Sequence, residues 1–230
     1  MKMIIDGKAV DSSDGKVLNV LNPATGEVID TVPLATEDDV NKAVSCAKEA
    51  QKIWAKVPVY EKVEILKKFI NLVLENKEDL ARTLSNETGK PIKEARAEIA
   101  NIPIAFDAFS EKAKHLYGTV VPAGLEAGQD KNILFTQMEP IGVVACVIPF
   151  NFPCDLYDQK VAPALLAGNA AIVKPSTDNP LTLCKLTELM VKAGVTPGAI
   201  QIITGRGSSV GSWLCSNPDV HLVTLTGSTE

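Results

Sequence analysis

What the sequence lacks excludes several kinds of site. It has no C-x-x-C pair and only two histidines, His115 and His221, so no zinc site is expected. Its five cysteines are scattered without pair spacing, and an odd number of unpaired thiols suits a reducing compartment. Internal repeats and low-complexity segments are absent, which argues against a solenoid or a disordered chain.

Long apolar runs and an excess of basic charge are also missing. The N-terminus has no apolar stretch of the kind found in signal peptides, and no run is long enough to span a bilayer. The net charge of -5 gives no reason to expect a nucleic-acid surface or an anionic membrane as a partner. We therefore expect a soluble, cytoplasmic protein.

The length and composition of the chain allow a sizeable hydrophobic core. The 230 residues, 46% hydrophobic and 22% charged, allow one large domain or two small ones. Residues 1–35 contain short extended pieces with a hairpin turn signal at Asp6-Gly7. Apolar residues then recur at helical spacing, and Thr36 with Asp39 resembles a capping box. Four helices are expected, at residues 36–54, 58–74, 77–87 and 91–117.

Residues 118–140 have a different character. Two short β-prone pieces, around Val120 and Leu134, are joined by a stretch that contains glycine and aspartate. This pattern predicts a hairpin that projects from the body. Because an isolated hairpin is marginally stable in water, it either packs on another subunit or is an ordinary surface loop.

From residue 141 onward, strands and helices alternate. The expected strands are apolar throughout, at residues 141–149, 170–175, 199–205 and 221–228, with a helix after each of the first three. Strands without a polar face belong to a parallel sheet that helices cover on both sides. The sequence therefore predicts an α/β fold: a parallel Rossmann-like sheet with N-terminal helices and a projecting β-hairpin.

Ligands of open parallel sheets bind outside the carboxyl ends of the strands, so the four strand exits are the candidate sites. The first exit, "PFNFP", holds Asn151 between Pro149 and Pro153, which stiffen the backbone on both sides. An amide fixed in this way can donate to a developing oxyanion. Asparagine is equally a favoured helix cap, and the following segment is helical, so both interpretations stand.

The other exits could hold phosphate groups. In "KPST", Lys174, Ser176 and Thr177 could bind a 2'-phosphate. The alternative is a solvated lysine before a helix that Asp178 or Asn179 caps. "TGRGSSVG" approximates a glycine-rich phosphate turn, or is a tight turn beside a packed helix. "LTGSTE" places small residues where a phosphate could approach backbone N–H groups, or is a simple strand-to-helix turn.

The order of these motifs is more specific than any one of them. "IPFNFP", "AGNAAIVKPS" and "LTGSTE" follow one another, preceded by "LNPATGEVI" and "ETGKPIKEARAEI". Together they resemble the aldehyde dehydrogenase superfamily over essentially the whole chain, and succinate-semialdehyde and lactaldehyde dehydrogenases in particular. The resemblance implies oxidation of an aldehyde to the carboxylic acid with NAD(P)+, through a cysteine thiohemiacetal and a water activated by glutamate. A small polar aldehyde or semialdehyde is the expected substrate.

The resemblance also implies roles for individual residues. Asn151 is expected to be the catalytic side chain that stabilises the oxyanion. Residues 118–140 match the family's oligomerisation hairpin, which implies a homodimer or homotetramer. The expected cofactor contacts are Ile148, Pro149, Phe150 and Asn151 along the cleft, Lys174, Ser176 and Thr177 at the adenosine ribose, Gly207 and Gly211 beneath the cofactor, Ser228 at the pyrophosphate, and Thr226 and Gly227 near the nicotinamide.

Two departures from the family pattern matter. Members that prefer NAD commonly have glutamate where Thr177 stands, so we expect NADP, or use of both cofactors. The catalytic glutamate and cysteine of the family follow the position of Glu230, and Cys154 is a weak substitute nucleophile. Residues 1–230 are thus expected to be a cofactor-binding domain that lacks the catalytic domain and does not turn over: 1–117 strands and helices, 118–140 hairpin, 141–230 dinucleotide-binding unit. The alternative is a non-catalytic nucleotide-binding or assembly module.

Overall fold

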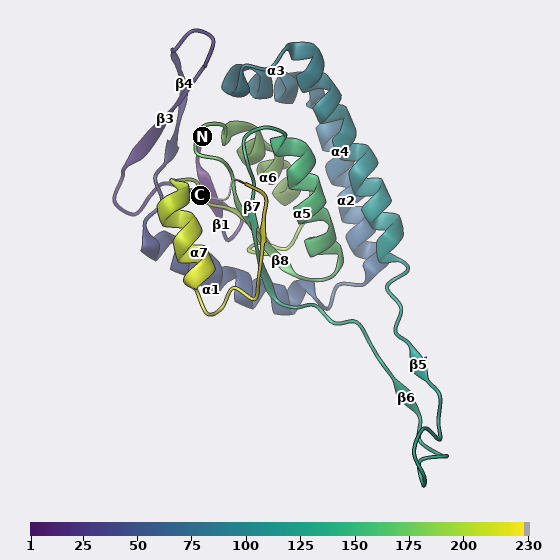
Figure 1. Cartoon of the computed structure of the whole chain (residues 1–230). Coiled ribbons are helices and arrows are strands. Elements are labelled where there is room, and N and C mark those ends of the chain that lie inside the picture. Colours follow the sequence, from purple (N-terminus) through teal and green to yellow (C-terminus); the bar gives the residue numbers. More distant parts are fainter. Residues whose placement is uncertain (228–230) are drawn as a thin grey trace.

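The computed structural model describes residues 1–227, and its core is a mixed six-stranded sheet. The strands are, in spatial order, β10 (Leu222–Leu225), β7 (Val143–Val147), β8 (Ala170–Lys174), β9 (Ile200–Ile202), β1 (Met3–Ile5) and β2 (Lys8–Val10). The first four are parallel neighbours. The predicted Rossmann-like α/β sheet is therefore confirmed (Figure 1).

The N-terminal hairpin extends this sheet in the antiparallel direction. Asp6 and Gly7 form its turn with φ of 54° and 70°, the left-handed pair that a two-residue hairpin requires. β1 then pairs with β9 through Ile4 and Ile202. The turn was predicted, but the attachment of β1 to the central sheet was not.

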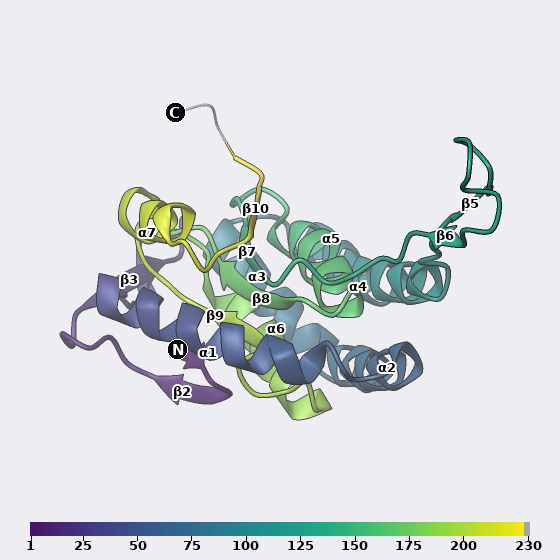
Figure 2. The same ribbon diagram turned by 90° about the horizontal axis from the view of Figure 1, so that it is seen from below.

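Helices cover both faces of the sheet. α1 (Glu37–Trp54) and α7 (Ser212–Ser216) lie on one side, and α5 (Pro153–Leu166) and α6 (Leu181–Ala193) lie on the other (Figure 2). Alternate strand residues divide accordingly: Val143 and Ala145 pack with α1, whereas Val144 and Cys146 pack with α5 and α6. This two-sided burial is why the strands lack a polar face.

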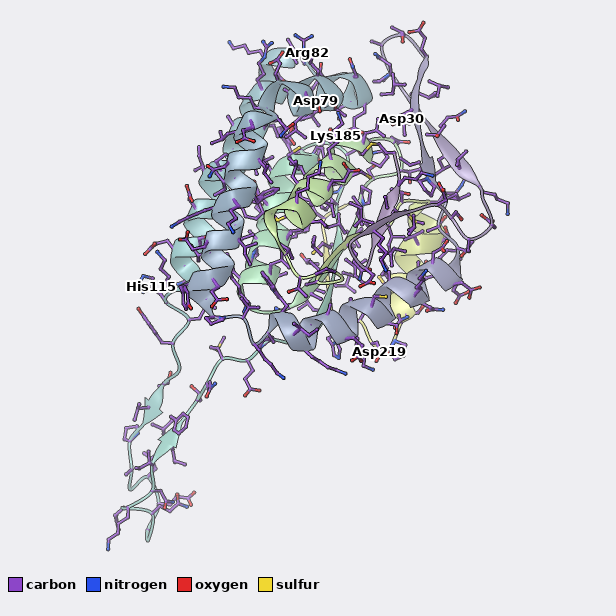
Figure 3. All side chains as sticks on the ribbon, turned by 180° about the vertical axis from the view of Figure 1, so that it is seen from behind. Asp30, Asp79, Arg82, His115, Lys185 and Asp219 are labelled. Atoms are coloured by element: carbon purple, nitrogen blue, oxygen red, sulfur yellow. The ribbon has the colours of Figure 1, made fainter. Side chains whose placement is uncertain are left out.

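Three further helices form an outer layer against α5 and α6. They are α2 (Val59–Glu75), α3 (Lys77–Thr88) and α4 (Ile92–Ala113). Lys185 of α6 pairs with Asp79 of α3 at 2.7 Å on this side of the molecule (Figure 3). The capping box of Thr36 and Asp39 is confirmed at the start of α1. The expected end of the fourth helix at Tyr117 was wrong, because α4 ends at Ala113.

Two ribbons stand apart from the sheet. One consists of β3 (Val17–Leu21) and β4 (Val28–Pro33), and the other of β5 (Val120–Val121) and β6 (Leu134–Phe135). The β5–β6 hairpin projects far from the body, with Val120 77% and Phe135 67% exposed (Figure 1). None of the helices formed by residues 1–227 combines the length and the apolar character needed to cross a membrane.

Candidate functional site

The parallel strands β10, β7, β8 and β9 bring the four predicted exits to one edge of the sheet. The N–H of Ile148 donates to the carbonyl of Lys174 at 3.0 Å, just beyond β7 and β8. The N–H of Thr226 donates to the carbonyl of Val147 at 3.3 Å, beyond β10. The polar residues of these loops therefore lie side by side although the chain separates them widely.

The turn after β7 leaves the amide of Asn151 free. α5 begins at Pro153 with Phe152 as the flanking residue, and no side chain of this loop caps it. The first turn of α5 is instead capped from outside, since the N–H of Cys154 donates to Oε1 of Glu98 at 2.8 Å. Asn151 is exposed, and its amide makes no hydrogen bond within residues 1–227. The alternative prediction, that Asn151 caps the following helix, was therefore wrong.

Side chains remote in sequence hold the backbone of this turn. Nζ of Lys90 donates to the carbonyl of Asn151 at 3.0 Å and lies 4.8 Å from the ring centre of Phe152. Lys90 is also ion-paired with Glu98. Nδ2 of Asn179 donates to the carbonyl of Phe150 at 2.8 Å. Sequence reasoning missed Lys90, Glu98 and Asn179; the only signal was that the first two belong to the "ETGKPIKEARAEI" stretch.

Asn151 lines a cleft of about 620 Å³. The cleft lies between residues 87–90 at the end of α3, the turn at residues 150–152, and residues 178–179. Phe150, 64% exposed, is part of its wall. Neither Lys174 nor Gly207 reaches this cleft, so the predicted site residues form two adjoining groups rather than one pocket.

The second group surrounds Lys174. Its side chain is 3% exposed, its ammonium donates to the carbonyl of Pro175 at 2.8 Å, and burial lowers its pKa to about 8. The hydroxyl of Thr177 donates to the carbonyl of Gly205 at 3.3 Å, joining this loop to the one after β9. The ammonium of Lys174 therefore lies where the loops after β8 and β9 come together.

The glycines after β9 divide by role. A Cβ on Gly205, whose φ is 148°, would lie 2.7 Å from Cγ2 of Val210, so this glycine serves close packing. A Cβ on Gly207 would meet nothing nearer than Nζ of Lys174 at 3.9 Å, and one on Gly211 would meet nothing within 4 Å. Gly207 and Gly211 begin and end a π-helical turn, Gly207–Gly211, a geometry often found at functional sites. Both glycines face open space rather than a packed helix, and Gly207 does so beside Lys174.

The remaining predicted residues vary in access. Ile148 is only 2% exposed, whereas Pro149, Ser176 and Thr177 are half-buried and Thr226 and Gly227 are exposed. Ser228 lies outside the described residues. The hydroxyl of Thr226 accepts from Nζ of Lys160 at 2.8 Å, and the hydroxyl of Thr224 does so at 3.1 Å. Lys160, a lysine on α5 whose pKa burial lowers, was not singled out from the sequence.

The two thiols of β7 and of the start of α5, Cys146 and Cys154, are not suited to act as the nucleophile. Cys154 is fully buried, and burial, followed by the charges of Glu98 and Glu87, raises its pKa. Burial likewise raises the pKa of Cys146 to about 12. Cys154 therefore does not replace the nucleophile that the family pattern expects. Within residues 1–227 no cluster of three or more His, Cys, Asp or Glu side chains could hold a metal ion.

Comparison with known proteins agrees with this geometry. The sequence profile of the aldehyde dehydrogenase family matches residues 9–230. The chain is 39% identical to D-glyceraldehyde dehydrogenase (NADP(+)) of Picrophilus torridus, covering all of this chain and 46% of that protein. It is 37% identical to succinate-semialdehyde dehydrogenase [NADP(+)] of Escherichia coli, covering 99% of this chain and again 46% of the relative.

A solved structure has the same arrangement of elements. NADP-dependent glyceraldehyde-3-phosphate dehydrogenase from Bacillus halodurans, complexed with NADP, superposes with a TM-score of 0.96 at 34% identity, covering 99% of this chain and 48% of that one. The chain thus spans about half the length of the proteins it matches. A profile that matches nearly the whole sequence, together with relatives above 30% identity and the same sheet, shows that this chain belongs to the aldehyde dehydrogenase family.

Proposed function

We propose that the protein oxidises a small polar aldehyde to its carboxylic acid with NADP, or with NAD as a second cofactor. Residues 1–227 would supply the nucleotide groove and the oxyanion donor, while the nucleophile and the general base would come from family positions beyond Glu230. The observation that carries this proposal is the side-chain amide of Asn151. It does not cap α5, and its turn is held by hydrogen bonds at the edge where β7 and β8 end.

The residues around Lys174 fit a dinucleotide. Gly207 leaves space beside the buried ammonium of Lys174, and Gly211 leaves space at the other end of the same turn, so a ribose or phosphate could approach the backbone closely. The cofactor would also contact the other predicted residues at the strand exits, namely Pro149, Phe150, Ser176, Thr226 and Gly227. Ile148 would lie behind them, and Ser228 would contact the pyrophosphate. The cofactor would supply the hydride acceptor; these residues would bind and orient it.

Thr177 supports NADP as the preferred cofactor. Its neutral hydroxyl cannot repel a 2'-phosphate, whereas a carboxylate at this position would do so. Two similar relatives carry NADP(+) in their names, and the B. halodurans structure contains NADP. Structures in complex with NAD also superpose on the chain, which is why NAD is retained as the second cofactor.

Asn151 would act at the moment when negative charge develops on the aldehyde oxygen. A donor whose orientation is already fixed stabilises the oxyanion without the cost of reorganising at that step. The relatives act on glyceraldehyde, succinate semialdehyde, glutarate semialdehyde and 3-sulfolactaldehyde, which supports a small polar aldehyde as the substrate.

The hairpin of residues 118–140 would mediate assembly into a homodimer or homotetramer in the cytoplasm. Val120, Ile133 and Phe135 are 77%, 84% and 67% exposed on this hairpin. A two-stranded ribbon is marginally stable by itself, and packing these apolar side chains against another subunit would stabilise it.

The test is a panel of aldehydes with each cofactor, using the protein as its gene encodes it. Asn151→Ala is expected to lower kcat by about 100- to 1000-fold, as losing one oxyanion donor does elsewhere, with a much smaller effect on cofactor Kd. Asn71→Ala, on the exposed face of α2, is the matched control and should have no effect. Cofactor binding without turnover of any aldehyde would favour the non-catalytic module instead, and full activity of Asn151→Ala would exclude the proposed role.

A further inference from the structure

We propose that Lys90 positions Asn151 for catalysis, acting through the backbone of the turn and held in place by Glu98. This inference rests on the proposed function, because positioning matters only if the amide of Asn151 meets the substrate oxygen. Lys90 follows α3 and Glu98 lies on α4, so the outer helical layer would set the geometry of a site at the edge of the sheet.

Lys90 itself has little freedom to move. Its side chain is 13% exposed, and its ammonium donates both to the carbonyl of Asn151 and to the carboxylate of Glu98. The same ammonium lies over the ring of Phe152, a favourable position for a cation. Its backbone is fixed too, since the hydroxyl of Ser85 donates to its carbonyl at 2.8 Å. The donor that faces Asn151 is therefore well defined in space.

Glu98 ties this lysine to the helix that follows the turn. Its side chain is 2% exposed; Oε2 accepts from Lys90 and Oε1 accepts from the N–H of Cys154 at 2.8 Å. One ion pair thus holds both sides of the turn: the carbonyl of Asn151 on one side and the first turn of α5 on the other. Asn179 adds a third restraint at the carbonyl of Phe150.

The direction of the Asn151 amide depends on these restraints. The amide has no hydrogen-bond partner of its own within residues 1–227, so the backbone of the turn sets where it points. Removing the donor of Lys90 releases the peptide that carries Asn151. A displacement of about 1 Å in a catalytic group can cost on the order of 100-fold in rate.

Four variants separate positioning from general stability. Lys90→Met removes the donor, and Lys90→Arg restores a cation that can still donate. Because Lys90→Met leaves the charge of Glu98 buried and unpaired, the double variant Lys90→Met/Glu98→Gln removes that charge while keeping an acceptor for Cys154. Lys93→Met, which changes an exposed lysine in the first turn of α4, is the matched control.

Two readouts apply to the protein as its gene encodes it. The first is steady-state kinetics together with cofactor Kd. The second is the side-chain amide resonance of Asn151 in protein labelled with 15N-asparagine, assigned by its loss in Asn151→Asp. Lys90→Met and the double variant are expected to lower kcat about 10- to 100-fold, to leave cofactor Kd unchanged, and to shift or broaden the Asn151 resonance. Lys90→Arg should recover most of both signals, and Lys93→Met should match the parent protein.

The outcomes distinguish this inference from the proposed function. A double variant that folds with parental kcat and an unshifted Asn151 resonance would overturn the positioning role. A shifted resonance together with unchanged kcat would also overturn it, because the amide would then move without consequence. If Asn151→Ala itself leaves activity intact, the proposed function fails, whatever Lys90 does to the resonance.

Discussion

The carboxyl group of Glu87 is expected to titrate near neutral pH. It lies in the last turn of α3 with 3% of its surface exposed, and accepts the N–H groups of Leu181 and Thr182 at 2.6 and 2.9 Å and the hydroxyl of Thr182. Burial raises its pKa from 4.5 to about 7, while the donors from Thr182 and Leu181 oppose the rise. Desolvation raises this pKa and hydrogen bonding lowers it, so a measured pKa shows which of the two effects is larger.

The direction of the effect on stability follows from which state holds the proton. Below pH 4.5 the carboxyl is protonated in both states, and it does not make stability depend on pH. Between 4.5 and about 7 the unfolded chain releases the proton while the folded chain keeps it, so the folded state loses stability as pH rises. At about 1.4 kcal/mol per pKa unit, the loss approaches about 3 kcal/mol as the pH rises through 7, and it levels off above that.

Carbon-13 NMR of protein labelled at the glutamate carboxyl carbons measures this pKa directly. Glu87→Gln identifies the resonance, and Gln keeps one oxygen as acceptor for the start of α6. Glu78, an exposed residue whose pKa Arg96 lowers, serves as an internal control that should titrate below 4.5. The expected midpoint for Glu87 is near 7. A midpoint at or below 4.5 would refute the reasoning, because the three donors would then outweigh burial.

Three further predictions concern the cofactor, the fold and the assembly. Thr177→Glu is expected to weaken NADP binding about 10-fold or more while sparing NAD, through repulsion of the 2'-phosphate; an equal loss of both cofactors in Kd measurements would contradict it. Gly205→Ala should destabilise the fold by about 1–3 kcal/mol in thermal unfolding because its Cβ would lie 2.7 Å from Val210, whereas Gly211→Ala, which meets open space, should not. Phe135→Asp, on the exposed hairpin, should shift the oligomer toward monomer in analytical ultracentrifugation, and an unchanged mass would argue against assembly through β6.

The sequence predicted the parts of the fold that local pattern determines. β7 and most of β8 are continuous apolar runs because both of their faces are buried, which is typical of a parallel sheet covered on both sides. The capping box at Thr36 is a four-residue signal and was read correctly. β1 could not be assigned to the central sheet, since three residues carry no information about a partner strand far along the chain. The end of α4 was placed too late because residues 114–117 lack a clear stop signal.

The candidate site shows the same limit. Asn151 and Lys174 could be located because each follows a strand, and neighbouring parallel strands end at one edge. Lys90, Glu98 and Asn179 could not, since their partners are up to 61 residues away and no periodicity encodes such a pair. The division of the predicted residues between the cleft of Asn151 and the group around Lys174 also depends on packing that the sequence does not reveal.

Two buried glutamates explain how the exit loops stay available for ligands. Neither α5 nor α6 has a side-chain cap of its own, and the flanking residues Phe152 and Pro180 cannot supply one. Glu98 caps α5 and Glu87 caps α6, both from the outer helical layer. If a loop residue such as asparagine or threonine capped the following helix, its side chain would be hydrogen-bonded to the backbone N–H groups of that helix and could not bind a ligand. Because Glu98 of α4 caps α5, the turn after β7 does not need Asn151 as a cap, and the side-chain amide of Asn151 stays free beside a cleft that the end of α3 also lines.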